Sequence, residues 1–165
     1  MEEFSIISHV KRFAHANELT ETHQSLLDAA KQAQQKAYAP YSGFSVGAAL
    51  LLEGGIIISG NNQENAAYPS GLCAERVSFY YAGAQHPNVP ILMVAIVAGN
   101  DAFPISDPIA PCGACRQAML EYELSQGKSI DVLLKGFGET IYQLESIKSL
   151  LPLHFFEATL KSRTT

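Results

Sequence analysis

The chain has 165 residues, of which 47% are hydrophobic and 16% are charged. This length suits one ordinary domain, and the composition is that of a folded core, which excludes a disordered or collagen-like chain. The formal net charge of -5 has the wrong sign for holding a phosphate backbone, so no nucleic-acid partner is expected.

The first part of the chain predicts a helix followed by a hairpin. Residues 22 to 38 carry apolar side chains at helical spacing after a threonine that can cap the helix, and a turn-rich segment follows. Residues 45 to 52 and 56 to 59 are short apolar runs. Gly54 and Gly55 lie between them and permit the positive dihedral angles of a tight hairpin, so both runs are predicted to be strands.

The second part of the chain alternates helices and strands. Residues 73 to 84 suit a helix, and the unbroken apolar run from 91 to 98 is typical of a strand covered on both faces. Further elements are predicted in the order helix, strand, strand and short helix, over residues 113 to 124, 129 to 135, 139 to 143 and 144 to 150. This order predicts an α/β fold with a mixed sheet and helices on its faces.

Three cysteines carry the main chemical signal. Cys112 and Cys115 open one predicted helix, and Cys73 opens another. A helix N-terminus favours thiolate over thiol, so the pair on one first turn can grip a metal ion, and Cys73 can supply a third ligand. Three thiolates around zinc leave the fourth tetrahedral position for water, which is the arrangement of a catalytic site.

A Cys-x-x-Cys pair by itself leaves two other interpretations open. It also fits a thioredoxin-like redox pair, or half of a four-cysteine structural zinc site. The redox interpretation expects no matched third cysteine, and the structural site needs a fourth ligand. The five histidines show no ligand-like spacing to any cysteine, so we interpret them as surface or packing residues.

Glu75 follows Cys73 by two positions, close enough to hydrogen-bond a zinc-bound water and move its proton. The helix dipole alone also favours an acidic residue in a first turn, so a structural role stays open. Together with Pro111 and the downstream cysteine pair, however, Glu75 completes the Cys-x-Glu and Pro-Cys-x-x-Cys signature of the zinc deaminases.

The chain resembles the cytidine deaminase family, in its small, homotetrameric form that acts on free nucleosides. The resemblance runs from about Thr20 to Phe156 and rests on four ordered blocks, which are Tyr38 to Ala48, Gly60 to Tyr68, Cys73 to Arg76 and Pro111 to Gln117. It implies a three-layer α/β/α cytidine deaminase-like fold with a mixed five-stranded sheet. Residues 1–19 are then an N-terminal extension, residues 20–156 the catalytic domain and residues 157–165 a C-terminal tail.

The resemblance implies zinc-dependent hydrolytic deamination of cytidine and deoxycytidine to uridine and deoxyuridine, with release of ammonia, as in pyrimidine salvage. The implied zinc ligands are Cys73, Cys112 and Cys115. Glu75 is the implied catalytic residue, which takes a proton from the metal-bound water and passes it to the pyrimidine ring and the leaving ammonia. The hydroxide attacks C4 of the ring.

The resemblance also assigns substrate contacts. Asn62 and Glu64 hydrogen-bond the 3'-hydroxyl of the sugar, and a carboxylate there repels a phosphate, which favours nucleosides over nucleotides. Phe44 packs beside the pyrimidine or sugar, and Ala74 is a further substrate-binding position. The alternatives are that Asn62 and Glu64 merely form turns and that Phe44 belongs to the core.

Two more features concern charge and assembly. Arg76 offsets the excess negative charge of three thiolates around one divalent ion, and the matching arginine of the family hydrogen-bonds ligand sulfurs. A surface salt bridge is the alternative for Arg76, and Arg116 stays open between a structural and a functional role. Phe155, with Phe156 as the next candidate, aligns with an aromatic residue that reaches into a neighbouring subunit's site. A homotetramer with shared active sites is therefore implied.

Three other functions stay open. A deaminase of a cytosine-nucleoside antibiotic should lack the pair Asn62 and Glu64, and a zinc-stabilised binding or redox module gives Glu75 no proton to move. A polynucleotide-editing deaminase usually has histidine in place of the first cysteine and needs a basic strip for the strand.

The location is expected to be cytoplasmic, with no membrane partner. No segment reaches the roughly 18 apolar residues of a membrane span, and the N-terminus has no basic region followed by an apolar run.

Overall fold

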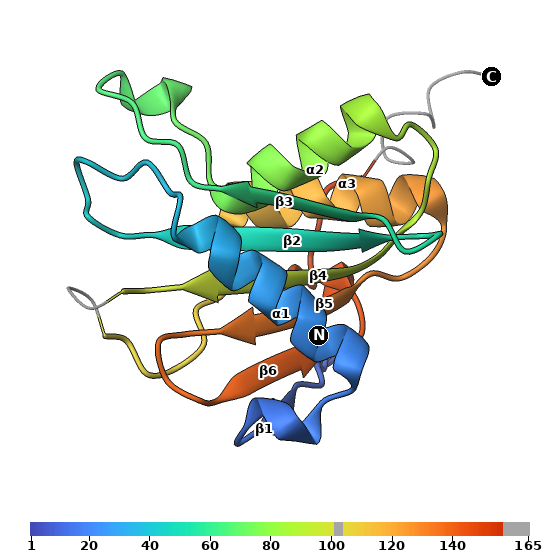
Figure 1. Cartoon of the computed structure of the whole chain (residues 1–165). Helices are drawn as coiled ribbons and strands as arrows, with labels where there is room; N and C mark the ends of the chain where they lie inside the picture. The colour runs from blue at the N-terminus through green and yellow to red at the C-terminus, as the bar shows by residue number, and fades with distance from the viewer. Residues whose placement is uncertain (101–103, 157–165) are drawn as a thin grey trace.

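The computed structural model describes residues 1–100 and 104–156, so the predicted C-terminal tail, residues 157–165, lies outside the described residues. One sheet lies between two layers of helices (Figure 1), with the strand order β1-β6-β5-β4-β2-β3. The strands are Lys11–Phe13 (β1), Val46–Leu52 (β2), Ile57–Asn61 (β3), Ile91–Ala98 (β4), Asp131–Lys135 (β5) and Ile141–Leu144 (β6). Among these strand pairs of the described residues, β4 and β5 are parallel and the others are antiparallel, so the sheet is mixed, as predicted.

The helices cover both faces of this sheet. Helix α1 packs on one face, and α2 and α3 lie side by side on the other (Figure 1). The α-helices are Glu21–Gln34 (α1), Ala74–Gln85 (α2) and Gly113–Gln126 (α3), and the 3-10 helices are Ala16–Glu18 (η1), Tyr68–Ser70 (η2) and Ile147–Leu150 (η3). The predicted three-layer α/β/α architecture is confirmed.

The unbroken apolar run of β4 is buried on both sides because its residues alternate between two cores. Val94 and Ile96 face the core under α2 and α3, while Ala95 and Val97 face the core under α1. Leu133 of β5 likewise belongs to the α1 core. The middle strands are therefore shielded from water by helices on both faces, as their composition predicts.

The sheet has six strands where five were expected, and the additional strand comes from the predicted N-terminal extension. Residues Lys11–Phe13 pair antiparallel with β6 at the edge of the sheet. Leu19, also from this segment, is 7% exposed and belongs to the α1 core. Three residues of strand carry too little alternation to be recognised from the sequence.

The predicted helices at 73 to 84 and 113 to 124 differ from α2 and α3 by one or two residues at their ends, and two other predicted helices differ more. Helix α1 ends at Gln34 and not at residue 38, because the chain turns so that Tyr38 bridges Gln63. The predicted short helix at 144 to 150 is the 3-10 helix η3, which begins after Ser146 and is capped by its side chain. The hairpin between β2 and β3 is confirmed, since Gly54 and Gly55 have φ angles of 85° and 83°.

The direction of two strands decides where the helices begin. Strands β3 and β4 both run antiparallel to β2, so they share one direction. Each is followed by a loop and then by a helix on the same face of the sheet, α2 after β3 and α3 after β4 (Figure 1). The first turns of α2 and α3 consequently lie next to each other. Within the described part of the chain, no helix is long and apolar enough to cross a membrane.

The contact between α1 and β2 predicts a strong effect of one methyl group. A Cβ atom at Gly47 would lie 2.0 Å from the carbonyl oxygen of Ala30 and 2.4 Å from the amide nitrogen of Gln34, both in the backbone of α1. We expect Gly47→Ala to push α1 off the sheet and to lower the free energy of unfolding by about 3 kcal/mol, measured by urea denaturation. Gly113→Ala is the control, because its added methyl meets no atom within 4 Å and should leave stability nearly unchanged. Equal stability of the two variants would contradict this account of the packing.

Candidate metal centre

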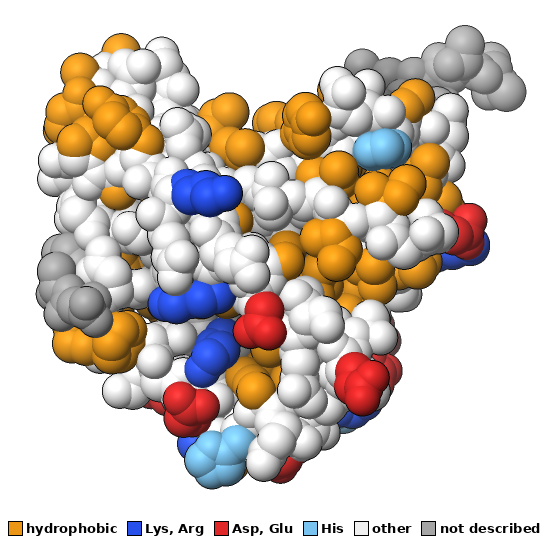
Figure 2. Space-filling view, in the orientation of Figure 1, with side chains coloured by type: hydrophobic (Ala, Val, Ile, Leu, Met, Phe, Trp, Pro, Cys, Tyr) orange, Lys and Arg blue, Asp and Glu red, His pale blue; other side chains and the backbone are white. Residues whose placement is uncertain are grey.

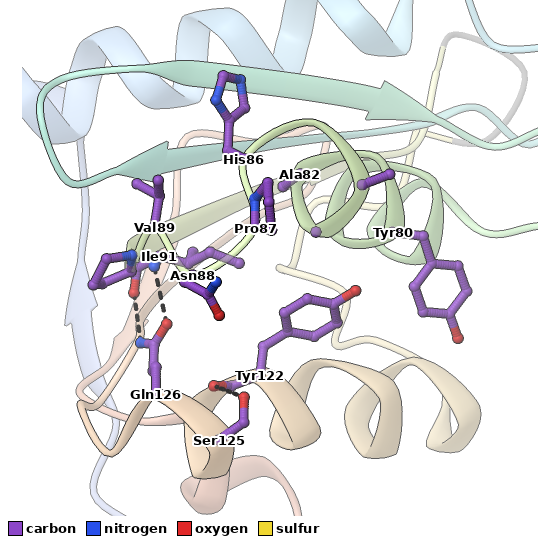
Figure 3. Close-up of a pocket in the computed structure, with 13 residues that line it drawn as sticks. Tyr80, Ala82, His86, Pro87, Asn88, Val89, Ile91, Tyr122, Ser125 and Gln126 are labelled. Carbon is purple, nitrogen blue, oxygen red and sulfur yellow. Dashed lines mark hydrogen bonds between the residues drawn. The ribbon is translucent and has the colours of Figure 1, made fainter.

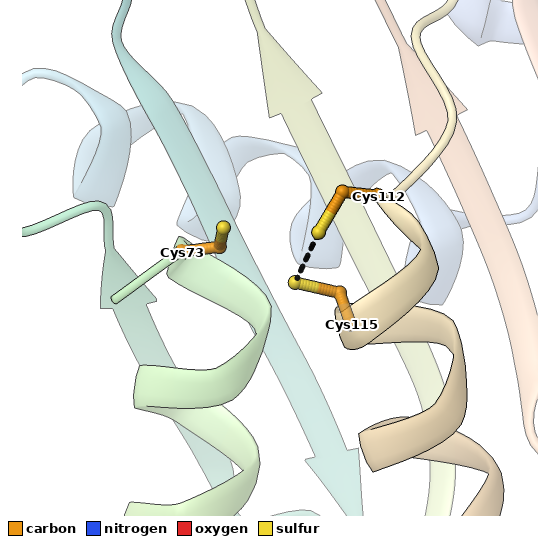
Figure 4. Close-up of side chains that lie close together, drawn as sticks. All are labelled: Cys73, Cys112 and Cys115. Atoms are coloured by element: carbon orange, nitrogen blue, oxygen red, sulfur yellow. Dashed lines mark hydrogen bonds between the residues drawn. The ribbon is translucent and has the colours of Figure 1, made fainter. Parts of the chain in front are cut away.

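The three cysteines of the sequence meet at the adjoining starts of α2 and α3. Cys73 is the N-cap residue of α2, Cys112 is the N-cap residue of α3, and Cys115 lies in the first turn of α3 (Figure 4). Their Sγ atoms all lie within 4.8 Å of one another, and those of Cys112 and Cys115 are 3.4 Å apart. The predicted juxtaposition of two helix starts is therefore present.

The sulfur cluster fits a zinc ion. Zinc–thiolate bonds are about 2.3 Å long, so a tetrahedral site places its sulfurs about 3.8 Å apart, close to the spacing here. No fourth Cys, His, Asp or Glu side chain joins the cluster among residues 1–100 and 104–156. The donor set is thus three soft thiolates with one side left open, which suits zinc better than magnesium or calcium.

The local electrostatics favour thiolate at Cys73. A hydrogen bond from the Cys115 thiol, together with the nearby Arg76, lowers the pKa of Cys73 to about 5. The same hydrogen bond raises the pKa of Cys115, because one proton is shared between the two sulfurs. Arg76 directs its Nη2 atom at the Cys73 sulfur over 3.8 Å. No salt bridge to Arg76 is found among the described residues, and the role predicted for it at the ligand sulfurs stays a prediction.

Glu75 is a buried carboxyl group beside these sulfurs. It is 4% exposed, and burial raises its pKa above the ordinary value for glutamate. A hydrogen bond from Cys115 opposes that shift. Ala74, the neighbour of Glu75, is fully buried. A carboxyl group that holds its proton closer to neutral pH is suited to giving and taking protons during a reaction.

A cavity of about 450 Å³ opens next to the cluster. Cys73 and Arg76 line it on one side, and Asn62 and Glu64 line it on another. The volume lies within the range of small-molecule sites. The structure therefore brings the two residues predicted to read the sugar into the same cavity as a predicted metal ligand.

Asn62 and Glu64 also hold the neighbouring loop. The Asn62 amide donates to the carbonyl oxygen of Phe44 over 2.9 Å and accepts from the amide of Val46 over 2.8 Å. The Glu64 carboxylate accepts from the backbone amides of Tyr41 and Ser42 and from the Ser42 hydroxyl. The hydrogen bond from that hydroxyl holds the pKa of Glu64 below its usual value. The turn-forming role considered for this pair is therefore present in the structure.

Three predicted substrate residues do not line this cavity. Phe44 is half-buried just before β2, Ala74 is fully buried, and Phe155 is 59% exposed on the C-terminal segment. The cavity instead contains Tyr41 and Tyr68, whose rings are 6.4 Å apart in an edge-to-face arrangement. Sequence reasoning gave neither tyrosine a place in this chain's own site, although an aromatic residue within a turn-rich loop is a usable signal.

A larger cavity, of about 600 Å³, lies elsewhere in the described structure. Figure 3 shows it between the C-terminal parts of α2 and α3, where Tyr80, His86 and Tyr122 line it. His86 follows Cys73 by 13 residues along α2, a distance of roughly 20 Å. Cavity size alone therefore does not identify the chemical site, whereas the sulfur cluster and the buried carboxyl group do.

Comparison with known proteins agrees with this geometry. Residues 20–127 match the model of the cytidine and deoxycytidylate deaminase zinc-binding region, and this match covers more than half of the chain. The chain belongs to this family. The predicted family and its enzyme class, a hydrolase, are thereby confirmed.

Individual relatives and solved structures lead to the same family. A cytidine deaminase of Halalkalibacterium halodurans is 44% identical over 98 residues, which are 59% of this chain and 70% of that protein. The crystal structure of a cytidine deaminase from Burkholderia pseudomallei superposes with a TM-score of 0.70 at 40% identity, over 81% of this chain and 98% of that one. A cytidine deaminase structure from Mycobacterium tuberculosis superposes with a TM-score of 0.63 at 30% identity, over 82% and 98% of the two chains.

The cluster predicts one zinc ion per chain, held by the three sulfurs. We expect Cys115→Ser to weaken zinc binding by about 100-fold or more, because a hydroxyl is a poor substitute for a thiolate. The affinity can be measured by competition with a chelating dye. His86→Ala is the control, since this side chain is a possible ligand that lies at the far end of α2, and it should bind zinc normally. Unchanged affinity in the serine variant would show that the sulfurs do not hold the ion.

Proposed function

We propose that this chain catalyses the zinc-dependent hydrolytic deamination of cytidine and deoxycytidine to uridine and deoxyuridine, with release of ammonia, as a step of pyrimidine salvage. The observation that carries the proposal is the buried Glu75 carboxyl beside three convergent sulfurs, one of which, that of Cys73, belongs to a residue lining a cavity of about 450 Å³. A purely structural zinc site needs no such carboxyl group and no cavity. Family membership and the names of the relatives support the same reaction.

The residues divide the work between binding, proton transfer and charge control. Cys73, Cys112 and Cys115 hold the zinc ion, which when bound supplies a water activated for attack near neutral pH. Glu75 would accept one proton from the attacking water and deliver it to the ring nitrogen N3, and would then move the second proton of that oxygen to the departing amino group. The water oxygen forms a bond to C4, the bond from C4 to the exocyclic nitrogen breaks, and ammonia leaves.

The surroundings of Glu75 support this proton transfer. Its burial raises the pKa above the ordinary value for glutamate, which is the direction that favours a group that both takes and gives a proton. Arg76 next to the Cys73 sulfur offsets part of the thiolate charge, which would otherwise oppose the loss of a proton from the water. Ala74 lies between Glu75 and the N-cap sulfur, and we propose that its backbone contacts the base.

Substrate selection follows from the other side of the cavity. We assign the free hydrogen-bonding capacity of Asn62 and Glu64 to the 3'-hydroxyl of the sugar. The carboxylate disfavours a phosphate there, so free nucleosides are preferred to nucleotides. Phe44 is proposed to pack against the pyrimidine or sugar from the loop that Asn62 and Glu64 hold in place.

Phe155 is proposed to complete a neighbouring subunit's site in a homotetramer. It is exposed, together with Leu153 and Phe156 on the same segment, and none of these side chains lines the cavity of its own chain. Hydrophobic side chains also gather over the loop that carries η2 (Figure 2), where Tyr68 is 78% exposed. Exposed apolar groups of this size favour a contact with another subunit.

The proposal includes the domain bounds and the location of the protein. We keep residues 20–156 as the catalytic domain, with residues 1–19 as an extension that contributes an edge strand. Three free thiols suit a reducing compartment, which supports a cytoplasmic location.

Glu75→Gln separates catalysis from metal binding. Because the amide cannot accept the proton, we expect the cytidine deamination rate to fall by about 1,000-fold or more, while zinc content stays at one ion per chain. Loss of cytidine is followed by ultraviolet absorbance, and zinc by metal analysis of the purified protein.

Glu53→Gln is the matched control for that substitution. Glu53 is exposed and pairs with Lys128 on the surface, so its variant should retain full activity. Undiminished deamination by Glu75→Gln would refute the proposed mechanism, and loss of zinc from it would point to a structural role for the carboxylate.

Glu64→Gln tests the proposed contact with the sugar. We expect KM for cytidine to rise by about tenfold with a smaller change in kcat, because the carboxylate acts in binding. The change should be much smaller for 3'-deoxycytidine, which lacks the hydroxyl. An equal rise in KM for both nucleosides would assign Glu64 to the loop of Tyr41 and Ser42 alone.

A further inference from the structure

Helix α3 also holds the C-terminal segment, through residues directly after the last cysteine. Arg116 donates from Nε to the carbonyl oxygen of Pro111 over 2.8 Å and from Nη1 to the carbonyl oxygen of Leu150 over 2.9 Å. Pro111 immediately precedes Cys112, and Leu150 is the last residue of η3. One guanidinium group thus joins the loop that carries a predicted ligand to the start of the C-terminal segment.

Gln117 adds a second tether to the same segment. Its side-chain amide donates to the carbonyl oxygen of Phe155 over 3.0 Å. Arg116 and Gln117 are consecutive residues of α3, so the two tethers begin at one point of the helix and end five residues apart on the segment. The backbone that carries the Phe155 ring is therefore fixed relative to the first turn of α3.

The other end of η3 is also anchored to α3. Glu123, which is 3% exposed, accepts hydrogen bonds from the amide of Ile147 over 2.8 Å and from the hydroxyl of Ser146 over 2.5 Å. Because Arg116 holds the last residue of η3 and Glu123 its first, η3 cannot move without breaking contacts with α3. The chain then leaves η3 in a defined direction towards Phe155.

The partners of Arg116 explain why this position carries an arginine. The planar guanidinium donates in two directions at once, which the single ammonium of lysine does not reproduce in fixed geometry. Both of its partners are backbone carbonyl oxygens, and no salt bridge to Arg116 is found in the described part of the chain. The group therefore acts as a clamp on two backbone segments.

We propose that Arg116, assisted by Gln117, is a positioning residue that sets the C-terminal segment so that the Phe155 ring is presented to a neighbouring active site. This inference rests on the proposed function, in which Phe155 contacts substrate across a subunit boundary. Arg116 touches no reacting atom, and its effect on the reaction passes through Phe155. The helix that supplies two sulfurs to its own site thereby also governs the aromatic wall of another.

A double-mutant cycle with cytidine tests this route. Arg116→Ala and Phe155→Ala should each raise KM for cytidine by about fivefold, the scale of one lost aromatic contact, with kcat nearly unchanged. Adding Arg116→Ala to the Phe155→Ala variant should raise KM no further, because the ring through which Arg116 acts is already absent. If KM in the double variant rose by the product of the two single effects, the proposal would be overturned. A fall in kcat together with loss of zinc in Arg116→Ala would also overturn it.

Two further variants test the second tether and provide a control. Gln117→Ala leaves the Pro111 contact intact and should raise KM in the same direction while zinc content stays normal. Arg12→Ala is the matched control, because Arg12 contacts Thr140 at the far edge of the sheet and should leave KM unchanged. An effect in Arg12→Ala equal to that in Arg116→Ala would also overturn the proposal.

Hydrogen exchange separates this proposal from the proposed function. The amide of Leu151, which donates to the carbonyl oxygen of Lys148 over 3.1 Å, should exchange at least about tenfold faster in Arg116→Ala than in the unmodified chain, whether or not cytidine is a substrate. Absence of deaminase activity in the unmodified chain would refute the proposed function. The exchange rates would still test whether Arg116 holds the C-terminal segment. Unchanged exchange in Arg116→Ala would refute the clamp even in an active enzyme.

Discussion

The whole site depends on the shared direction of two strands that are not neighbours. Strands β3 and β4 lie on either side of β2 and run the same way, so the helices that follow them begin at the same end of the sheet. Each helix start offers unpaired amides and the positive end of its dipole. Side chains whose anionic form is stabilised by these amides and dipoles therefore lie close together there. Cys73 and Cys112 are among them, although they lie far apart in the sequence.

The convergence of three cysteines brings negative charge together, and neighbouring groups can offset it. Three thiolates around one divalent cation would carry excess negative charge, and the helix starts and Arg76, which lies 3.8 Å from the Cys73 sulfur, are placed where they would offset it. Glu75 lies in the same first turn but is buried, and burial counteracts the tendency of the helix start to ionise it. The start of one helix thus contains a thiol whose pKa is lowered and a carboxyl group whose pKa is raised.

Local signals predicted most of the fold, and long-range contacts decided the rest. The paired glycines marked the hairpin, and the apolar run from 91 to 98 marked β4 at its true bounds. The end of α1 depends on a bridge between Tyr38 and Gln63, which no local pattern reveals. At the site, the cysteine spacing predicted the sulfur cluster. The positions of the two tyrosines in the cavity and the contacts of Arg116 depend on tertiary packing, so the sequence did not predict them.

The edge strand β1 has a consequence for how the chain behaves at high concentration. Without it, β6 would present its unpaired amides and carbonyl groups as a template on which another polypeptide could add a strand. The strand that covers β6 is three residues long and begins with the exposed, positively charged Lys11 and Arg12. Lys11 pairs with Glu145 over 2.7 Å, and Arg12 is exposed at this edge, so a short strand with charged side chains is what a further polypeptide would meet, which is a poor template for edge-to-edge aggregation.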